Sequence, residues 1–257
     1  MAIALVASTG KSVGINGGSL DAINTTGATA IIVGVGGFGT VTISDNKGNS
    51  YTPLTGYTQA DSATFRFHYV LTPVVGSGHV ITLSGSGIYC AATAYAFSGA
   101  INYDSRQNGA SGTSSPLNAG SVTPSVNGAL VITGTTAGGI AATFSTPSGF
   151  TGLIQVTGIG AVSVYAVGAY QIQTTAAAIN PQWTWTGSTN VAAAVAVFAE
   201  IPGTAIARLS QLPVEVGILD SVPVSFRLSQ LAIEVLINTS IVPPTVTEKT
   251  QFMIIMP

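Results

Sequence analysis

The residues best placed for chemistry in this chain are Arg66 and His68, which alternate with Phe65, Phe67 and Tyr69. Successive side chains of a β-strand point to opposite faces, so Arg66 and His68 would share one face while the aromatic rings face a core. Such a pair can contact a small anion or a sugar. An ordinary amphipathic strand shows the same alternation, and we expect this second interpretation, with both side chains on a solvated face.

A second candidate is the pair Trp183 and Trp185, which lie two residues apart and therefore on one face of a strand. Exposed indole rings can stack on the apolar face of a sugar, which would make these two residues a glycan contact. Tryptophan also buries a large area in protein cores. An internal repeat, described below, aligns the two residues with Ile81 and Leu83, and this alignment favours a place in the core.

The loop Asp45–Asn49 carries oxygen atoms that can bind calcium, but it lacks the several acidic residues of a calcium loop. Asn46 and Gly48 are typical of a tight hairpin turn, and we expect a turn here. His79 has no acidic residue near it in the sequence, and no motif of a serine nucleophile is present.

The remaining acidic residues do not form a convincing catalytic pair. Glycoside hydrolysis needs two carboxyl groups that face one cleft. Asp61 and Asp104 would form such a pair only if the fold brings them close together. The sequence therefore assigns no catalytic residue, no cofactor and no metal, and we expect that the protein is not an enzyme.

The composition limits the partners of the chain. Only 6% of its 257 residues are charged, against about 25% in a typical protein, and the formal net charge is −2. The basic residues are scattered singly, which argues against nucleic-acid binding. The longest apolar run, Val191–Ala199, is much shorter than the roughly 20 residues of a spanning helix, which argues against membrane insertion. Cys90 lies in an apolar run, and we expect it to be buried.

Short runs of β-branched and aromatic residues between Gly, Asn, Ser and Pro predict an all-β fold. We expect an antiparallel β-sandwich, jelly-roll-like, with two similar halves and a C-terminal extended β arm. The expected strands are Ala28–Val35, Thr40–Ser44, Thr64–Leu71, Val80–Ser84, Tyr89–Phe97, Ala129–Thr133, Val162–Gln173, Trp183–Thr186 and Val191–Ala199.

Three pairs of similar segments support the two halves, because each pair is separated by 101 or 102 residues. The pairs are Gly27–Val33 with Gly128–Thr133, Ile81–Ser86 with Trp183–Ser188, and Ala91–Phe97 with Ala192–Phe198. We expect residues 1–200 to form one sandwich, with Asp104–Pro124 as the crossover between its halves.

Residues 201–257 differ in composition and contain a sharper repeat. Arg208–Val216 recurs as Arg227–Val235, with seven of nine positions identical. Each copy reads as an extended strand, and an isolated two-stranded ribbon is only marginally stable in water. We therefore expect this arm to dock on another surface by strand pairing. The candidate interface residues are Arg208, Gln211, Leu212, Val214, Glu215, Arg227, Gln230, Leu231, Ile233 and Glu234.

The segment Ser44–Thr52, followed by Phe67–Tyr69 and Ala94–Gly99, resembles a β-sandwich pattern of tailed-bacteriophage and related bacterial surface proteins. The repeat in the arm, with Arg208 and Glu215, resembles C-terminal segments of phage virion structural proteins. This resemblance implies a virion component without catalysis.

We thus expect a non-enzymatic structural protein of a bacteriophage virion, located in the tail, fibre, baseplate or head surface. It would assemble through its arm with other virion proteins and as a homo-oligomer, since virion parts repeat. A capsid decoration protein is one alternative. A carbohydrate-binding or host-receptor-binding module that contacts a host surface glycan is another, and a glycan hydrolase that uses two aspartates is a third.

Overall fold

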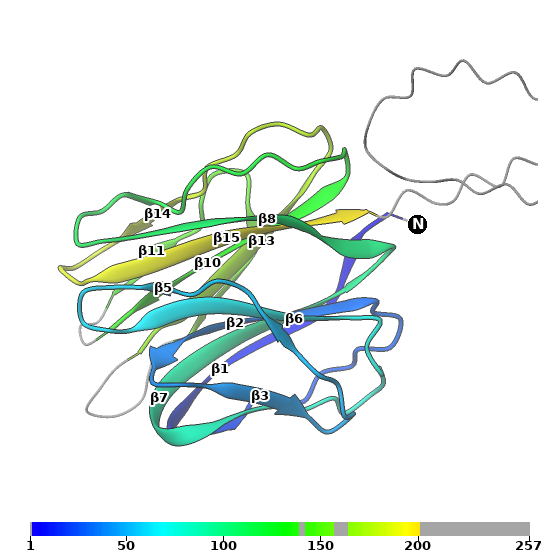
Figure 1. The fold of residues 1–257 in the computed structure, drawn as a ribbon, viewed down its shortest axis with the longest axis horizontal. Helices are drawn as coiled ribbons and strands as arrows, with labels where there is room; N and C mark the ends of the chain where they lie inside the picture. The colour runs from blue at the N-terminus through cyan, green and yellow to red at the C-terminus, as the bar shows by residue number, and fades with distance from the viewer. Residues whose placement is uncertain (1, 139–141, 157–163, 201–257) are drawn as a thin grey trace, which may run out of the picture. The chain divides into compact units, whose positions relative to one another are not determined.

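A computed structural model describes residues 2–138, 142–156 and 164–200, and every regular element in these residues is a β-strand (Figure 1). The strands are β1 (Ala4–Ser19), β2 (Ala30–Phe38), β3 (Thr42–Asp45), β4 (Thr52–Pro53), β5 (Tyr57–Thr58), β6 (Thr64–Leu71), β7 (Ile81–Ser98), β8 (Ile101–Gly112), β9 (Leu117–Asn118), β10 (Ala129–Ala137), β11 (Phe144–Ser145), β12 (Thr151–Val156), β13 (Ala166–Gln173), β14 (Gln182–Trp185) and β15 (Val191–Glu200).

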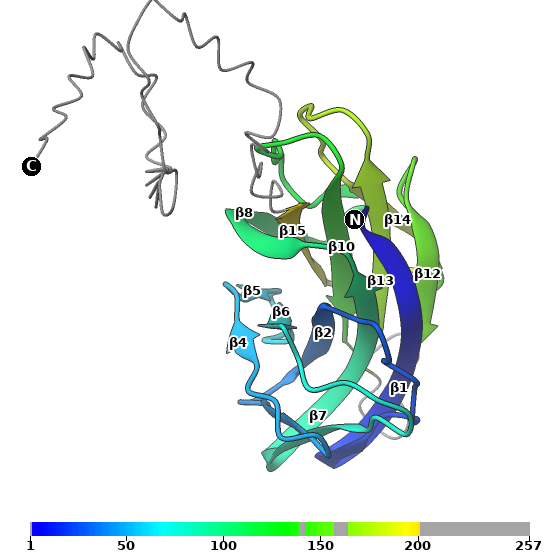
Figure 2. The ribbon, with the colours of Figure 1, turned by 90° about the vertical axis from the view of Figure 1, so that its right-hand side faces the viewer.

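The strands form two large antiparallel sheets that face each other (Figures 1 and 2). The first sheet runs β1-β7-β2-β6-β4, with β3 added on β7 and β5 added on β6. The second sheet runs β12-β13-β10-β15-β8. A third, small sheet, β11-β14-β9, shares no strand pairing with either large sheet in the described residues. The prediction of an all-β antiparallel sandwich is confirmed.

The two large sheets share one topology, and each half of residues 2–200 supplies all the strands of one large sheet. The strand order β1-β7-β2-β6-β4 matches β8-β15-β10-β13-β12 position by position. The packing between the sheets has the same symmetry. Strand β6 packs on β15, and their counterparts in the other sheet, β13 and β7, also pack on each other. Isolated bridges also correspond, with Ile23 paired to His79 and Val122 paired to Ile179. The internal repeat is therefore structural, and its two copies form a single sandwich.

The main core lies between the two sheets. Aromatic side chains of the first sheet meet smaller apolar side chains of the second; this core contains Phe65, Phe67, Tyr95, Phe97, Leu130, Ile132, Ala192, Ala194, Ala196 and Phe198. One contact is especially close, because a Cβ atom added to Gly134 would lie 2.2 Å from Cζ of Phe65. Only glycine at 134 lets the Phe65 ring approach the backbone of β10 in this way.

Each sheet is also covered on its outer face. The third sheet and its connections cover the second sheet, where Phe144, Trp183 and Trp185 pack with Val131 and Val195. Over the first sheet the covering segments are smaller, and Ile43, Tyr51 and Val75 pack against a cluster that contains Ile81 and Leu83. The halves therefore share a topology but differ in how fully their outer faces are closed.

Two long strands were not expected from the sequence. β1 contains Gly10, Gly14 and Gly17, which resemble turn residues, but the strand accommodates them through three register shifts against β7. β8 includes the first residues of the segment Asp104–Pro124, which we expected to be a crossover without a strand. That expectation was wrong for these first residues, because they pair with β15. The expected strands Val80–Ser84 and Tyr89–Phe97 are parts of one long strand, β7.

Candidate functional site

The residues Arg66 and His68 lie in the middle of β6, where the register with β2 sets their direction. His68 is opposite Val33, and Arg66 is opposite Val35. Residues directly opposite in an antiparallel pair share one face of the sheet. The neighbours Phe65 and Phe67 are fully buried in the core between the sheets. The alternation expected from the sequence is thus confirmed, and Arg66 and His68 share the outer face.

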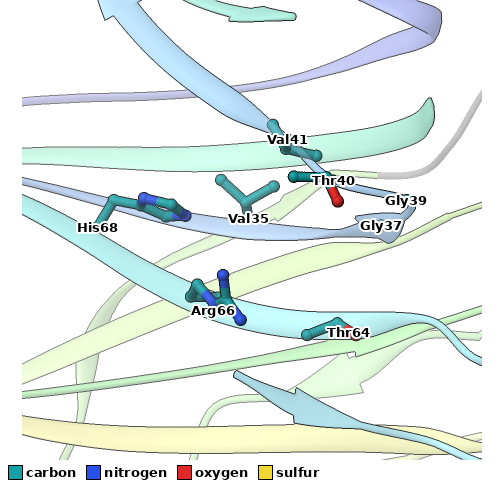
Figure 3. Close-up of a pocket in the computed structure, with 8 residues that line it drawn as sticks. All are labelled: Val35, Gly37, Gly39, Thr40, Val41, Thr64, Arg66 and His68. Carbon is teal, nitrogen blue, oxygen red and sulfur yellow. The ribbon is translucent and has the colours of Figure 1, made fainter. Parts of the chain in front are cut away.

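A pocket of about 120 Å³ opens on this face (Figure 3). Its lining consists of Val35, Gly37, Gly39, Thr40, Val41, Thr64, Arg66 and His68. The close-up shows the side chains of Val35 and Val41 on one side of the pocket and Arg66 and Thr64 on β6. Arg66 and His68 are the ionisable members of this set, so the pocket combines a short apolar wall with one permanent positive charge.

The expectation that both side chains are solvated was wrong for His68. Arg66 is exposed, but His68 keeps only 8% of its surface accessible. Burial, followed by the positive charge of Arg66, lowers the pKa of His68 to about 4. The imidazole is therefore neutral at neutral pH, and it makes no hydrogen bond to another residue in the described ranges. The sequence alternation could not reveal this burial, because burial depends on segments from elsewhere in the chain that pack over the strand.

The second half shows what the same sheet positions look like without a pocket. The positions that correspond to Arg66 and His68 are Val167 and Ala169, which are opposite Thr135 and Thr133 on β10. Both are fully buried under the third sheet, together with Trp183. An arginine and a histidine at this place are thus not a requirement of the fold.

The two tryptophans belong to the core, as the repeat indicated. Trp183 has no accessible surface and its Nε1 donates to Oγ1 of Thr133 over 3.0 Å, while Trp185 is 7% exposed. Neither ring is available to stack on a sugar. The glycan contact proposed for Trp183 and Trp185 is therefore wrong, because both rings close the outer face of the second sheet.

The loop Asp45–Asn49 is a turn, as expected. Oδ1 of Asp45 accepts hydrogen bonds from the backbone N–H groups of Lys47 and Asn49, at 2.9 and 3.0 Å. Burial alone would raise the pKa of Asp45, but hydrogen bonds from Asn49, His79 and Tyr51 outweigh this effect and lower the pKa to about 2. The carboxylate oxygens are used to hold the turn together.

The tertiary structure also gives His79 an acidic partner that the sequence did not indicate. Nε2 of His79 lies 2.9 Å from Oδ2 of Asp45, and neither side chain has accessible surface. On the other side of the ring, Nδ1 lies 2.9 Å from Oγ1 of Thr25. The order of hydroxyl, imidazole and carboxylate resembles a nucleophile–base–acid arrangement. Because all three groups are buried, this network has no access for a substrate, and it ties together three loops at one end of the first sheet.

The remaining candidates have structural partners. Asp61 accepts a hydrogen bond from Asn190, whereas Asp104 accepts from the backbone N–H of Ser125 and contacts Arg106. No hydrogen bond or ion pair connects Asp61 with Asp104 in residues 2–138, 142–156 and 164–200.

In the same ranges, no group of three His, Cys, Asp or Glu side chains is placed to hold a metal ion. Cys90 is buried as expected, and burial raises the pKa of its thiol to about 11.

The ten candidate interface residues of the arm, Arg208, Gln211, Leu212, Val214, Glu215, Arg227, Gln230, Leu231, Ile233 and Glu234, lie outside the described residues. Within the described ranges, no helix has the length and hydrophobicity needed to cross a membrane. Comparison of the chain with protein-family models, with curated protein sequences and with solved structures finds no match.

Proposed function

We propose that the protein is a non-enzymatic structural component of a bacteriophage virion. In this proposal residues 1–200 form a rigid body, and residues 201–257 attach it to neighbouring copies or to other virion proteins. The proposal rests on the resemblance of the sandwich and arm segments to phage proteins and on the physical properties of the described sandwich.

The observation that carries the proposal is the use that the sandwich makes of its few ionisable side chains. Asp45 and His79 hold loops together, Asp104 contacts Arg106, and Lys11 forms an exposed ion pair with Asp21. These groups are paired with other residues of the sandwich, and among the ionisable side chains of the described residues only Arg66 and His68 line the pocket. A surface with so little charge has few electrostatic means of keeping a free monomer soluble, which favours a protein that is covered by neighbours in an assembly.

The proposal is tested in particles produced from a genome that encodes this chain. Purified particles should contain the protein in a fixed copy number, measured by quantitative mass spectrometry. Labelling with an antibody against the sandwich, viewed by electron microscopy, should place it at one position. A position on the head would favour the capsid decoration alternative over a tail, fibre or baseplate component. Absence of the chain from purified particles would contradict the proposal.

The role of the arm is tested in the full-length chain by replacing Leu212, Leu231 and Ile233 with aspartate. Each charge would interrupt the apolar side of an arm strand, so incorporation into particles should fall to background. The matched control is Val74→Asp, which adds one charge at a side chain that is already 60% exposed in the sandwich. Normal incorporation of the arm variant would show that attachment uses another surface.

A further inference from the structure

We propose that the pocket formed around Arg66 and His68 binds the carboxylate group of a small ligand, which is either an acidic sugar or a free organic acid. This inference does not depend on the virion proposal. It rests on the geometry of the pocket, on the lack of partners for its two ionisable side chains, and on the comparison between the two halves of the protein.

The first argument is that the two ionisable side chains of the pocket, Arg66 and His68, have no hydrogen-bond or ion-pair partner inside the described part of the protein. His68 is more than nine-tenths buried, and its ring is directed toward the pocket beside Val35 (Figure 3). In the described ranges neither His68 nor Arg66 makes a hydrogen bond or an ion pair. The hydrogen-bonding capacity of both side chains is therefore unused within the described residues and is available to a ligand. A ligand with acceptor oxygens would satisfy both side chains at once.

The second argument comes from the other copy of the sheet. The corresponding residues Val167 and Ala169 pack under Trp183 and leave no ionisable group on that face. The fold is therefore stable with aliphatic residues at these positions. In the first half, Ile81 and Leu83 occupy the places of the two tryptophans, and the smaller cover leaves the pocket open beside Arg66.

The third argument concerns the charge and shape of the ligand. At neutral pH the imidazole of His68 is uncharged, so the lining carries the single positive charge of Arg66. One guanidinium matches the two oxygens of one carboxylate in charge and in geometry. Inorganic phosphate is a mixture of monoanion and dianion at neutral pH, and its dianion would be only half neutralised. Thr40 and Thr64 line the same space, although the Thr64 hydroxyl is already hydrogen-bonded to Thr58, and Val41 offers an apolar contact to the carbon atoms that bear the carboxylate.

A neighbouring backbone segment also restricts one side of the guanidinium. A Cβ atom added to Gly56 would lie 2.9 Å from both Nε and Nη2 of Arg66, so the side chain rests against the backbone of the segment between β4 and β5. A cation that is already placed loses less conformational entropy when a ligand binds.

The test is a titration of the full-length protein at pH 7 and constant ionic strength, followed by NMR of the Val35 and Val41 methyl groups and the His68 ring. The probes are sodium glucuronate, sodium acetate, glucose and inorganic phosphate. Glucuronate, acetate or both should shift these three signals to saturation, whereas glucose should not. Tighter binding of glucuronate than of acetate identifies an acidic sugar as the source, and equal binding identifies a free organic acid. Equal shifts with glucose, no saturable shift with either carboxylate, or tighter binding of phosphate would overturn the proposal.

Two variants add a second measurement. Arg66→Gln should weaken carboxylate binding by about tenfold or more, because a charge-assisted hydrogen bond is worth about 1.5–3 kcal/mol. The control is Lys11→Gln, which removes an exposed cation outside the pocket and should leave the affinity unchanged. Unchanged affinity in a folded Arg66→Gln variant would refute the proposal. If that variant does not fold, the comparison of glucuronate with glucose in the natural protein still decides.

Discussion

Replacing Asp45 with asparagine should reveal how much the buried loop network stabilises the fold. The pKa of Asp45 falls from 3.8 to about 2 in the folded protein, and its side chain has no accessible surface. A shift of this size corresponds to about 2 kcal/mol of stability at neutral pH. Asparagine keeps the shape of the side chain, but it lacks the negative charge that strengthens the hydrogen bonds from Tyr51 and His79 to the carboxylate oxygen. We therefore expect the free energy of unfolding at pH 6 to decrease by about 2 kcal/mol.

The dependence on pH gives the sharper test, because the sign is determined. The folded pKa of Asp45 lies below the unfolded value, so its contribution is complete above pH 3.8 and disappears as the pH falls through about 2. At pH 2 the carboxyl group should contribute less than about 0.5 kcal/mol, and the natural protein and Asp45→Asn should then differ little.

The assay is unfolding in urea at pH 6 and pH 2, followed by the fluorescence of the buried residues Trp183 and Trp185. The control is Asp21→Asn, which removes an exposed ion pair with Lys11 and should change the unfolding free energy by less than about 1 kcal/mol at either pH. The reasoning fails if the gap between the natural protein and Asp45→Asn is the same at both pH values, or if Asp21→Asn is equally harmful.

Two further predictions concern the cores. Gly134→Val should lower the unfolding free energy by about 1–3 kcal/mol, because its added atoms would meet the Phe65 ring between the sheets; an unchanged thermal midpoint would show that the sheets separate freely. Trp183→Ala should cost about 3–5 kcal/mol in urea unfolding, because it opens a cavity in the outer core and leaves Thr133 without its donor. A loss below about 1 kcal/mol would mean that the third sheet collapses onto the space.

The repeat of about 101 residues was the most informative feature of the sequence for the fold. It correctly indicated two similar halves, because equivalent strands such as β7 and β15 keep a similar run of small residues that leads to Phe97 and Phe198. It also placed Trp183 and Trp185 in the core by alignment with Ile81 and Leu83. Alternation on β6 gave the correct face for Arg66 and His68, because direction on a strand depends only on position along the chain.

The sequence was misleading where neighbours from elsewhere in the chain decide the outcome. Glycine-rich β1 reads as turns, but pairing with β7 satisfies its backbone and makes it a strand. His68 is buried although its strand alternation predicts a solvated side chain, and the partner of His79 is 34 residues away.

By itself, then, the sequence determined the β class, the duplication and the faces of residues in strands that it predicted, such as β6, since these follow from local periodicity and from the repeat. Only the tertiary structure decided which outer face is sealed by tryptophans and which keeps an open pocket beside Arg66. The physical reason is that side-chain direction is a property of the strand, whereas burial, hydrogen-bond partners and pKa depend on what packs over the strand.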